Sequence, residues 1–330
     1  IMALKILLQG DLFLCASGYG KSNKLLIEIF KKLGHEVALF AHYGLEGIPP
    51  MKVDGITVYS RARAMYGDDV VEAHFVNLGA DVVITNIDPF VLPHYGDRIF
   101  PWIPIVPVSG DPFPPQYIDA IRGALEIITI SRYGQQVLSD AGIPSEHIYL
   151  PVNTDHYSPL NRSMARSPFG WRDDLYIVGH VGMNRGIRKG HDILLRAFQI
   201  FLTEVPNSLL YLHADTRQHD GLQLESIIKE LGLEQYVKYP TSYDSFYGKS
   251  DWWMKGLYNA IDLYVQPSLN EGQGIPVWEA MSSAQSIVAT DATALSEVME
   301  AADAIAVPTK HKIPMPYMAW GHVVTAEDLA

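Results

Sequence analysis

Short runs of apolar residues alternate along the chain with segments in which apolar residues recur at helical spacing. In the first half the predicted strands are 4–10, 36–41, 55–60, 81–86, 103–110 and 126–131, and a predicted amphipathic helix is 21–34. Continuous β-branched runs between helices are typical of a parallel sheet that is covered by helices on both faces. The pattern therefore predicts an α/β fold for the first half.

The same alternation starts again at residue 175. The predicted strands are now 175–182, 208–215, 236–240, 262–268, 286–291 and 305–308, and the predicted helices are 190–204, 221–231, 251–261 and 276–284. Each half has about the size of a nucleotide-binding domain, which indicates two Rossmann-like, doubly wound parallel sheets. Because ligands of such sheets bind at the carboxyl ends of the strands, we expect the two domains to face each other across a cleft.

The segment between the two halves, 150–174, is rich in Pro, Ser, Asn and Arg and has no periodicity. This composition is typical of an exposed linker. We therefore predict a first domain at 1–155, a linker at 156–174 and a second domain at 175–330.

Composition and charge narrow the class of protein. The 330 residues are 48% hydrophobic and 19% charged, as in globular proteins, and the net charge of −12 argues against nucleic-acid binding. The single cysteine, Cys15, excludes an internal disulfide and suits a reducing cytoplasm. The apolar run 3–18 looks like a secretion signal, but Asp11 interrupts it and a first core strand explains it better. We expect a cytoplasmic protein without an integral membrane segment, for which peripheral membrane contact stays open.

The strongest candidate site lies at 267–291. Glu271 and Glu279 are separated by seven residues, and Pro276 suits the first turn of a helix between them. Glu271 is then expected in a loop at a strand end and Glu279 about one turn inside the helix. Carboxylates accept hydrogen bonds from sugar hydroxyls, and the free amides of the helix start can hold hydroxyl or phosphate oxygens. On spacing alone, an acidic first turn stabilised by the helix dipole explains these residues equally well.

This segment resembles the signature of glycosyltransferase family 4, retaining enzymes of the GT-B fold. The matching residues are Pro267, Ser268, Glu271, Gly272, Gly274, Glu279, Ala280, Met281, Ala289, Asp291 and Glu297. The departures are Gln273 for Phe, Ala284-Gln285-Ser286 for Gly-x-Pro, and Ala292-Thr293 near a Gly-Gly pair.

The resemblance implies roles for the residues of this segment. It implies that Glu271, together with the amides of Gly272, Gln273, Gly274 and Ile275, holds the donor sugar. It also implies that Glu279 holds the ribose. The changes at Gln273 and Thr293 bear on the choice of sugar.

A basic loop in 181–215 resembles the family's phosphate-binding segment. Lys189 falls on the lysine that binds the donor pyrophosphate, and Met183 replaces the family's usual arginine. The resemblance therefore implies that Arg185 or Arg188 supplies the second cation. Two cations beside a helix start can neutralise a departing diphosphate without a metal ion. Without the resemblance, these residues would be an exposed basic loop.

The first half carries a glycine-rich segment, 17–40, that resembles the first loop and helix of the same family. Gly18 and Gly20 would let a ligand approach the backbone at a helix start. Residues 15–22 also nearly match a Walker phosphate loop, although Cys15 takes the first glycine position and Asn86 interrupts the strand that should end in an aspartate. A phosphate-loop kinase or ATPase is therefore an alternative, and a non-catalytic nucleotide-sugar-binding protein is another.

The acceptor is expected on the first domain. Asp88 and Asp111 follow predicted strands and are candidates for positioning an acceptor hydroxyl, although each also precedes a proline and would begin a turn. The acceptor stays open between a glycan, a lipid-linked molecule and a small molecule.

Together these features predict a metal-independent retaining glycosyltransferase whose donor is a UDP- or GDP-sugar. We expect no cofactor and no metal site, because His213, Asp215 and His219 lack the compact spacing of a zinc site. In the resembling family the helix that begins near Thr325 continues and further helices follow. We therefore expect either that the native chain extends beyond Ala330 or that the two domains of this chain are loosely coupled.

Overall fold

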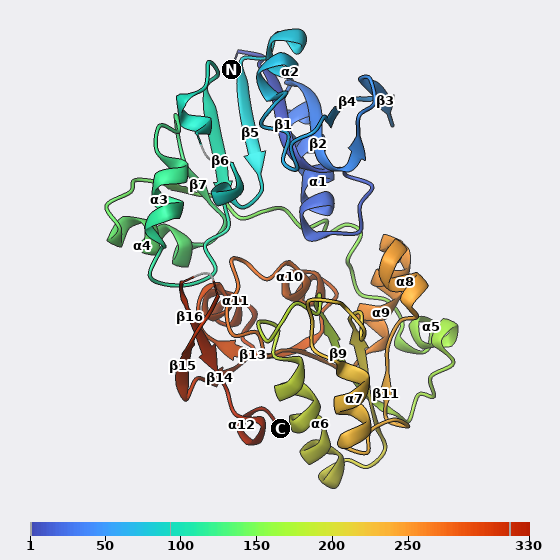
Figure 1. Ribbon diagram of the computed structural model, residues 1–330. Helices are drawn as coiled ribbons and strands as arrows, with labels where there is room; N and C mark the ends of the chain where they lie inside the picture. Colours follow the sequence, from blue (N-terminus) through green and yellow to red (C-terminus); the bar gives the residue numbers. More distant parts are fainter. Residues whose placement is uncertain (1, 93, 317) are drawn as a thin grey trace. The chain divides into compact units, whose positions relative to one another are not determined.

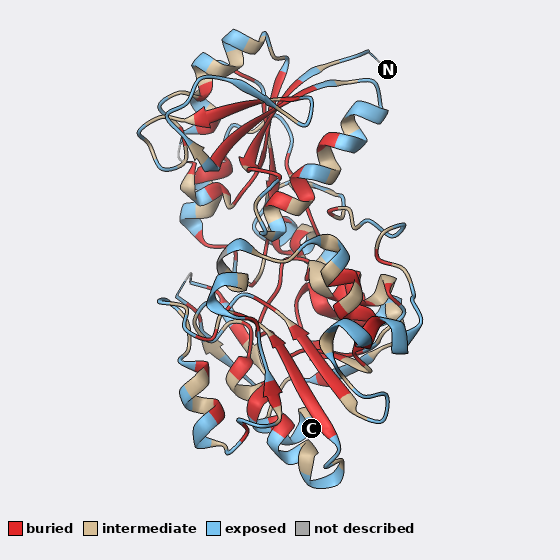
Figure 2. Cartoon of the chain, turned by 90° about the vertical axis from the view of Figure 1, so that its right-hand side faces the viewer, coloured by how far each residue is buried: buried red, intermediate tan, exposed pale blue. Residues whose placement is uncertain are grey.

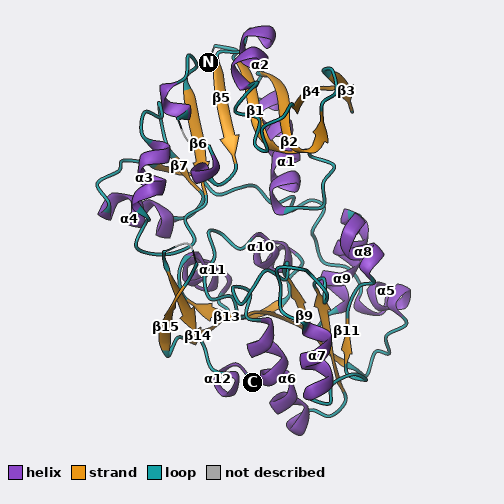
Figure 3. Cartoon of the chain, viewed as in Figure 1, coloured by secondary structure: helices purple, strands orange, loops and turns teal. Residues whose placement is uncertain are grey.

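The computed structural model describes residues 2–92, 94–316 and 318–330 (Figure 1). The chain forms two compact units, Ile1–Pro151 and Val152–Ala330, and each is described by itself. Both units contain a mostly parallel sheet flanked by helices (Figure 3), so the predicted α/β fold class is confirmed.

The first unit is built on an eight-stranded sheet with the order β3-β4-β2-β1-β5-β6-β7-β8. Its strands are β1 (Lys5–Asp11), β2 (Glu36–Glu46), β3 (Met51–Val53), β4 (Ile56–Arg61), β5 (Val82–Asn86), β6 (Trp102–Val106), β7 (Ile128–Thr129) and β8 (Glu146–His147). The short strand β3 pairs with β4 antiparallel, whereas the other pairs are parallel. Its α-helices are α1 (Gly18–Lys32), α2 (Val71–Leu78), α3 (Pro115–Ile121) and α4 (Arg132–Asp140).

A close contact fixes α1 against the carboxyl ends of β1 and β5. A Cβ atom at Gly10 would lie 2.3 Å from Nδ2 of Asn23, so only glycine lets the helix come this near. The Asn23 amide donates to the carbonyl of Asp11 at 2.8 Å and its oxygen accepts from Asn86 at 2.8 Å. Asn23 thereby joins the first helix to two neighbouring strands.

The second unit has a six-stranded, wholly parallel sheet with the order β11-β10-β9-β12-β13-β14. Its strands are β9 (Tyr176–Val181), β10 (Ser208–His213), β11 (Val237–Lys238), β12 (Leu263–Gln266), β13 (Ser286–Asp291) and β14 (Ile305–Pro308). The helices are α5 (Arg162–Arg166), α6 (His191–Glu204), α7 (Leu224–Glu230), α8 (Ser242–Tyr247), α9 (Asp251–Ala260), α10 (Ile275–Ser282), α11 (Ala294–Ala302) and α12 (Ala326–Leu329). A separate antiparallel hairpin, β15 (His311–Pro314) with β16 (Trp320–Val323), was not predicted.

Consecutive residues of the central strands belong to different apolar clusters. Ile177 packs with residues of α9, α10 and α11, whereas its neighbour Val178 packs with residues of α6 and α7. Tyr264 and Val265 of β12 divide in the same way. Because successive strand side chains point to opposite faces, both faces of the sheet are buried under helices, and the strands are the most buried part of the unit (Figure 2).

The segment predicted as a linker, 156–174, is folded onto the second unit. It contains α5, and Arg166 at the end of that helix is fully buried. The Arg166 guanidinium donates to the carbonyls of Ala260 and Leu175 and to the carboxylate of Asp262. The composition of this segment predicted an exposed linker. It did not reveal the burial of Arg166, because arginine is rarely buried and a single buried residue leaves no periodic signal.

In the described part of the chain, no helix has the length and apolar character needed to cross a membrane.

Candidate functional site

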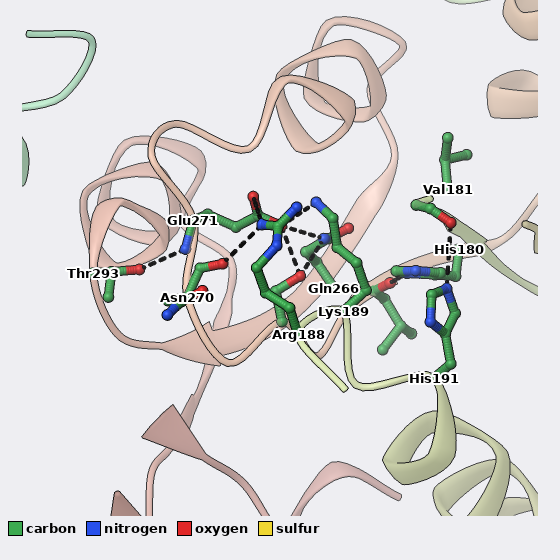
Figure 4. Close-up of polar contacts among 12 residues, drawn as sticks. His180, Val181, Arg188, Lys189, His191, Gln266, Asn270, Glu271 and Thr293 are labelled. Carbon is green, nitrogen blue, oxygen red and sulfur yellow. Dashed lines mark hydrogen bonds and ion pairs between the residues drawn. The ribbon is translucent and has the colours of Figure 1, made fainter. Parts of the chain in front are cut away.

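Glu271 lies in the loop that follows β12, and Lys189 lies in the loop that follows β9 (Figure 4). The two strands are hydrogen-bonded neighbours in the sheet, so their carboxyl ends place both loops at the same edge. A Cβ atom at Gly190 would lie 2.2 Å from the carbonyl oxygen of Pro267, and the residue has a φ of +67°. Glycine at this position therefore lets the two loops touch.

The carboxylate of Glu271 is surrounded by donors. Lys189 Nζ, Ser268 Oγ (2.7 Å) and Gln266 Nε2 (3.1 Å) donate to Oε1, and Arg188 donates to Oε2 at 3.1 Å. Glu271 is only 5% exposed and Lys189 7%, whereas Arg188 is partly exposed. We call Arg188, Lys189 and Glu271 the charged cluster.

Two cations share one carboxylate in this cluster. Burial by itself would raise the pKa of Glu271, but the charges of Lys189 and Arg188 and the hydrogen bonds of Lys189 and Ser268 outweigh it and lower that pKa to about 2. Burial lowers the pKa of Lys189 to about 8. The charge of Glu271 raises this pKa and offsets the effect of burial only in part, and the charge of Arg188 lowers it further. At neutral pH the cluster is therefore ionised and carries one excess positive charge.

Two histidines beside Lys189 add no charge. His180 is wholly buried, and burial lowers its pKa to about 4, although its Nδ1 donates to the carbonyl of Val265 at 2.8 Å. Burial, followed by the nearby His180, also lowers the pKa of His191. The excess positive charge of the charged cluster thus comes from Lys189 and Arg188.

The affinity of the cluster for an anion is expected to fall at alkaline pH. Lys189 keeps its charge below its pKa of about 8 and loses it as the pH rises above that value. Binding of inorganic diphosphate, measured by calorimetry, should therefore weaken about fivefold between pH 8 and pH 9. Lys189→Arg keeps a cation throughout this range, so its affinity should stay level. Parallel pH profiles for the two proteins would contradict this assignment.

The segment after Glu271 leads directly into a helix, as the sequence predicts. Gly272, Gln273 and Gly274 are buried, Gly274 has a φ of +77°, and α10 begins at Ile275. A left-handed residue before the first turn favours glycine. The loop therefore turns sharply at Gly274, and the first amides of α10 follow Glu271 within a few residues.

Glu279 lies inside α10 but outside the charged cluster. It is buried, and its Oε2 accepts a hydrogen bond of 2.6 Å from the Tyr258 hydroxyl of α9. Burial, then the charge of Glu279, raises the pKa of Tyr157 and of Tyr258, so both stay neutral phenols. No periodic signal in the sequence pointed to either tyrosine as a neighbour of Glu279.

The structure distinguishes the two arginines that the sequence left as alternatives. Arg188 contacts Glu271, whereas Arg185 is 63% exposed and lies 3.7 Å from Asp220. Asn184 holds the intervening loop in place, because its amide donates to the carbonyls of Asp215 and Leu222. The second cation of the cluster is therefore Arg188.

The remaining predicted site residues belong to the first unit. Ser17 caps α1, which begins at Gly18, and a Cβ atom at Gly20 would lie 2.5 Å from the carbonyl oxygen of Cys15. Asp88 precedes a short 3-10 helix after β5, and Asp111 accepts a hydrogen bond of 3.2 Å from Tyr133. Gly20 thus has a packing role, and a Cβ atom at Gly18 would meet nothing within 4 Å.

The geometry of α1 argues against a Walker phosphate loop. The helix begins at Gly18, so residues 18–20, which should form part of the loop, lie in the first helical turn. At the end of β5, Asn86 Nδ2 donates to Ser22 Oγ at 2.9 Å. An amide therefore occupies the place opposite Ser22 where a Walker enzyme has its magnesium-binding aspartate.

Across residues 2–92, 94–316 and 318–330, no three His, Cys, Asp or Glu side chains are grouped in a way that could hold a metal ion.

Comparisons with known proteins agree with this geometry. Residues 175–314 match the family model described as Glycosyl transferases group 1. Over 167 residues the chain is 28% identical to mannosylfructose-phosphate synthase of Agrobacterium fabrum. That alignment covers 47% of this chain and 35% of the relative, so the matched stretch spans about a third of the relative's length.

Solved structures of low sequence identity share the fold. Sucrose-phosphate synthase from Thermosynechococcus elongatus is 18% identical with a TM-score of 0.75, over 92% of this chain and 86% of that one. Anabaena Alr3699/HepE in complex with UDP and glucose is 19% identical with a TM-score of 0.71, over 99% and 88% of the two chains. The fold is therefore that of the GT-B glycosyltransferases. Residues 175–314 are thus similar to the group 1 glycosyl transferases, which agrees with the resemblance of the chain's motifs to family 4.

Proposed function

We propose that the chain is a retaining, metal-independent glycosyltransferase that moves a sugar from a nucleotide-sugar donor to an acceptor hydroxyl. The observation that carries this proposal is the charged cluster, in which two cations share one buried carboxylate. One positive charge is left over for an anionic group, and the match of residues 175–314 to the group 1 family supports a diphosphate in that place.

The cluster suits departure of a diphosphate. Negative charge grows on the diphosphate as the glycosidic bond breaks, so Lys189 and Arg188 stabilise the transition state more than the bound donor. These cations would take over the electrostatic role that a metal ion has in other transferases. No further cofactor is needed, because the two substrates supply every atom of the product.

The environment of both glutamates supports retention without a covalent intermediate. A retaining hydrolase uses one carboxylate as a nucleophile. Glu271 is held by Lys189, Arg188 and Ser268, which hold its pKa near 2 and make it a poor nucleophile. Glu279 accepts a hydrogen bond from Tyr258. We therefore propose that the acceptor attacks on the face from which the diphosphate leaves, and that a diphosphate oxygen takes the acceptor's proton.

The relatives suggest which substrates to try first. Alr3699/HepE was solved with UDP and glucose, and two of the relatives are by name synthases of a sugar phosphate. We propose a UDP-sugar as the first donor and include GDP-sugars and hexose phosphates in the screen. Asp88 and Asp111 of the first unit remain our candidates for positioning the acceptor hydroxyl. We also propose that the reaction takes place in the cytoplasm.

A thermal-shift screen followed by a transfer assay tests the proposal. A nucleotide sugar in large excess over its dissociation constant should raise the melting temperature, since it binds the folded state alone. Transfer should then persist in EDTA, and proton NMR of the first product should show the donor's anomeric configuration. Complete loss with EDTA would refute metal independence, and an inverted product would refute retention. Donor binding without hydrolysis or transfer would instead support a non-catalytic binding protein.

A further inference from the structure

Thr293 lies next to Glu271 in a backbone conformation that threonine rarely adopts. It precedes α11 with φ +54° and ψ −142°. This region is used mainly by glycine, and a β-branched residue with a positive φ is a true outlier. The sequence has Thr293 near the place where the family pattern has a Gly-Gly pair, so the backbone keeps a glycine-like conformation although the side chain is different.

The Thr293 hydroxyl does not make the contact usual for its position. A threonine before a helix commonly accepts a hydrogen bond from an amide of that helix's first turn, but Thr293 makes no such bond. Its Oγ1 accepts instead from the backbone amide of Glu271 at 3.1 Å. Both residues are buried, with exposed fractions of 7% and 5%.

The neighbouring backbone groups of this loop are held from other directions. The amide of Leu269 donates to the carbonyl of Arg188, and its carbonyl accepts from His322 of the hairpin, both at 2.8 Å. Arg188 also donates to the carbonyl of Asn270. Thr293, at the start of α11, therefore holds the backbone amide of Glu271 by a hydrogen bond (Figure 4). The carboxylate of the same Glu271 completes the charged cluster.

We infer that Thr293 is a positioning residue, which holds the Glu271 backbone so that its carboxylate stays between Lys189 and Arg188. This role rests on the proposed function, because the positioning of Glu271 is expected to affect the turnover number of the glycosyltransferase. Strain that persists beside a site is maintained by the surrounding structure, and the hydroxyl contact to Glu271 is the feature that a glycine here would lack. A misplacement of about 1 Å in a positioned group can lower turnover about 10²-fold.

Three substitutions distinguish the effect of the Thr293 hydroxyl from the effect of the strained backbone at this position. Thr293→Val keeps the branched side chain and removes the hydroxyl, Thr293→Gly removes both, and Thr293→Ser keeps the hydroxyl. Asp303→Gly is a matched control at the other end of α11, because Asp303 is exposed and has a φ of +49°. It should relieve strain and raise the melting temperature without changing turnover.

We expect Thr293→Val and Thr293→Gly to lower the turnover number about tenfold or more, with affinity for UDP alone nearly unchanged. Thr293→Gly should nevertheless melt at or above the temperature of the parent protein. Thr293→Ser should restore most of the turnover that Thr293→Val loses. A merely structural role predicts that turnover and UDP affinity follow the melting temperature, and full turnover in Thr293→Gly would overturn the inference.

A second measurement does not depend on activity. Hydrogen exchange of the Glu271 amide should be faster in Thr293→Val and Thr293→Gly than in the parent protein or Thr293→Ser. Unchanged exchange rates would show that the Thr293 hydroxyl does not hold the Glu271 amide. If the parent protein transfers no sugar but the exchange rates differ as expected, the proposed function fails and the positioning of Glu271 by Thr293 stands.

Discussion

Lys189→Ala is expected to lower the turnover number about 10²–10³-fold, the range for removing one preorganised donor from a developing negative charge. Donor affinity should change much less, because the charge on the diphosphate grows only as the glycosidic bond breaks. Lys189 is buried and contacts Glu271. Steady-state kinetics with the donor found in the screen measures both quantities.

Arg185→Ala is the matched control for this experiment. Arg185 lies four positions earlier in the same loop, but it is exposed and lies beside Asp220. Its loss should leave the turnover number nearly unchanged. A Lys189→Ala protein with normal turnover and only a raised Michaelis constant would show that the lysine binds substrate without acting on the transition state.

Arg166→Ala is expected to destabilise the second unit by about 3–5 kcal/mol, the usual result of removing one partner of a buried ion pair. The substitution would remove the 2.5 Å hydrogen bond that Arg166 donates to the Asp262 carboxylate. It would also remove the hydrogen bonds that Arg166 donates to the carbonyls of Ala260 and Leu175. Five of the six tryptophans lie in the second unit, so urea unfolding followed by tryptophan fluorescence reports mainly on it.

Arg162→Ala tests the same carboxylate from the solvent side. Arg162 also donates to Asp262, but its side chain is 59% exposed. Exposed ion pairs contribute about 0–1 kcal/mol, so this variant should unfold close to the parent protein. Equal destabilisation by the two substitutions would mean that burial of Arg166 has no special part in holding the segment.

The alternation of strands and helices could be predicted because it depends on local periodicity. Strands such as β9 and β13 are near-continuous apolar runs, since both faces of the sheet are covered. The family motifs predicted that Lys189 and Glu271 both serve the donor, but the ion pair between these two residues, 82 positions apart, was not predicted. Their loops meet because β9 and β12 are neighbours in the sheet.

Other features depend on contacts that no periodic pattern records. The choice of Arg188 over Arg185 follows from the turn of a single loop that Asn184 holds. Arg166 is buried because several carbonyls and one carboxylate converge on it, whereas composition alone favours exposure. The hydroxyl of Thr293 accepts a hydrogen bond from the amide of Glu271, which lies 22 positions earlier in the chain.

The shared carboxylate has a consequence for how the site meets its ligand. Glu271 acts as an internal counter-ion that keeps two like charges side by side before any anion arrives. The repulsion between Lys189 and Arg188 is therefore overcome during folding and does not oppose binding. An incoming anion finds the cations already assembled around a fixed partner, in a place that salt screens less than the open surface.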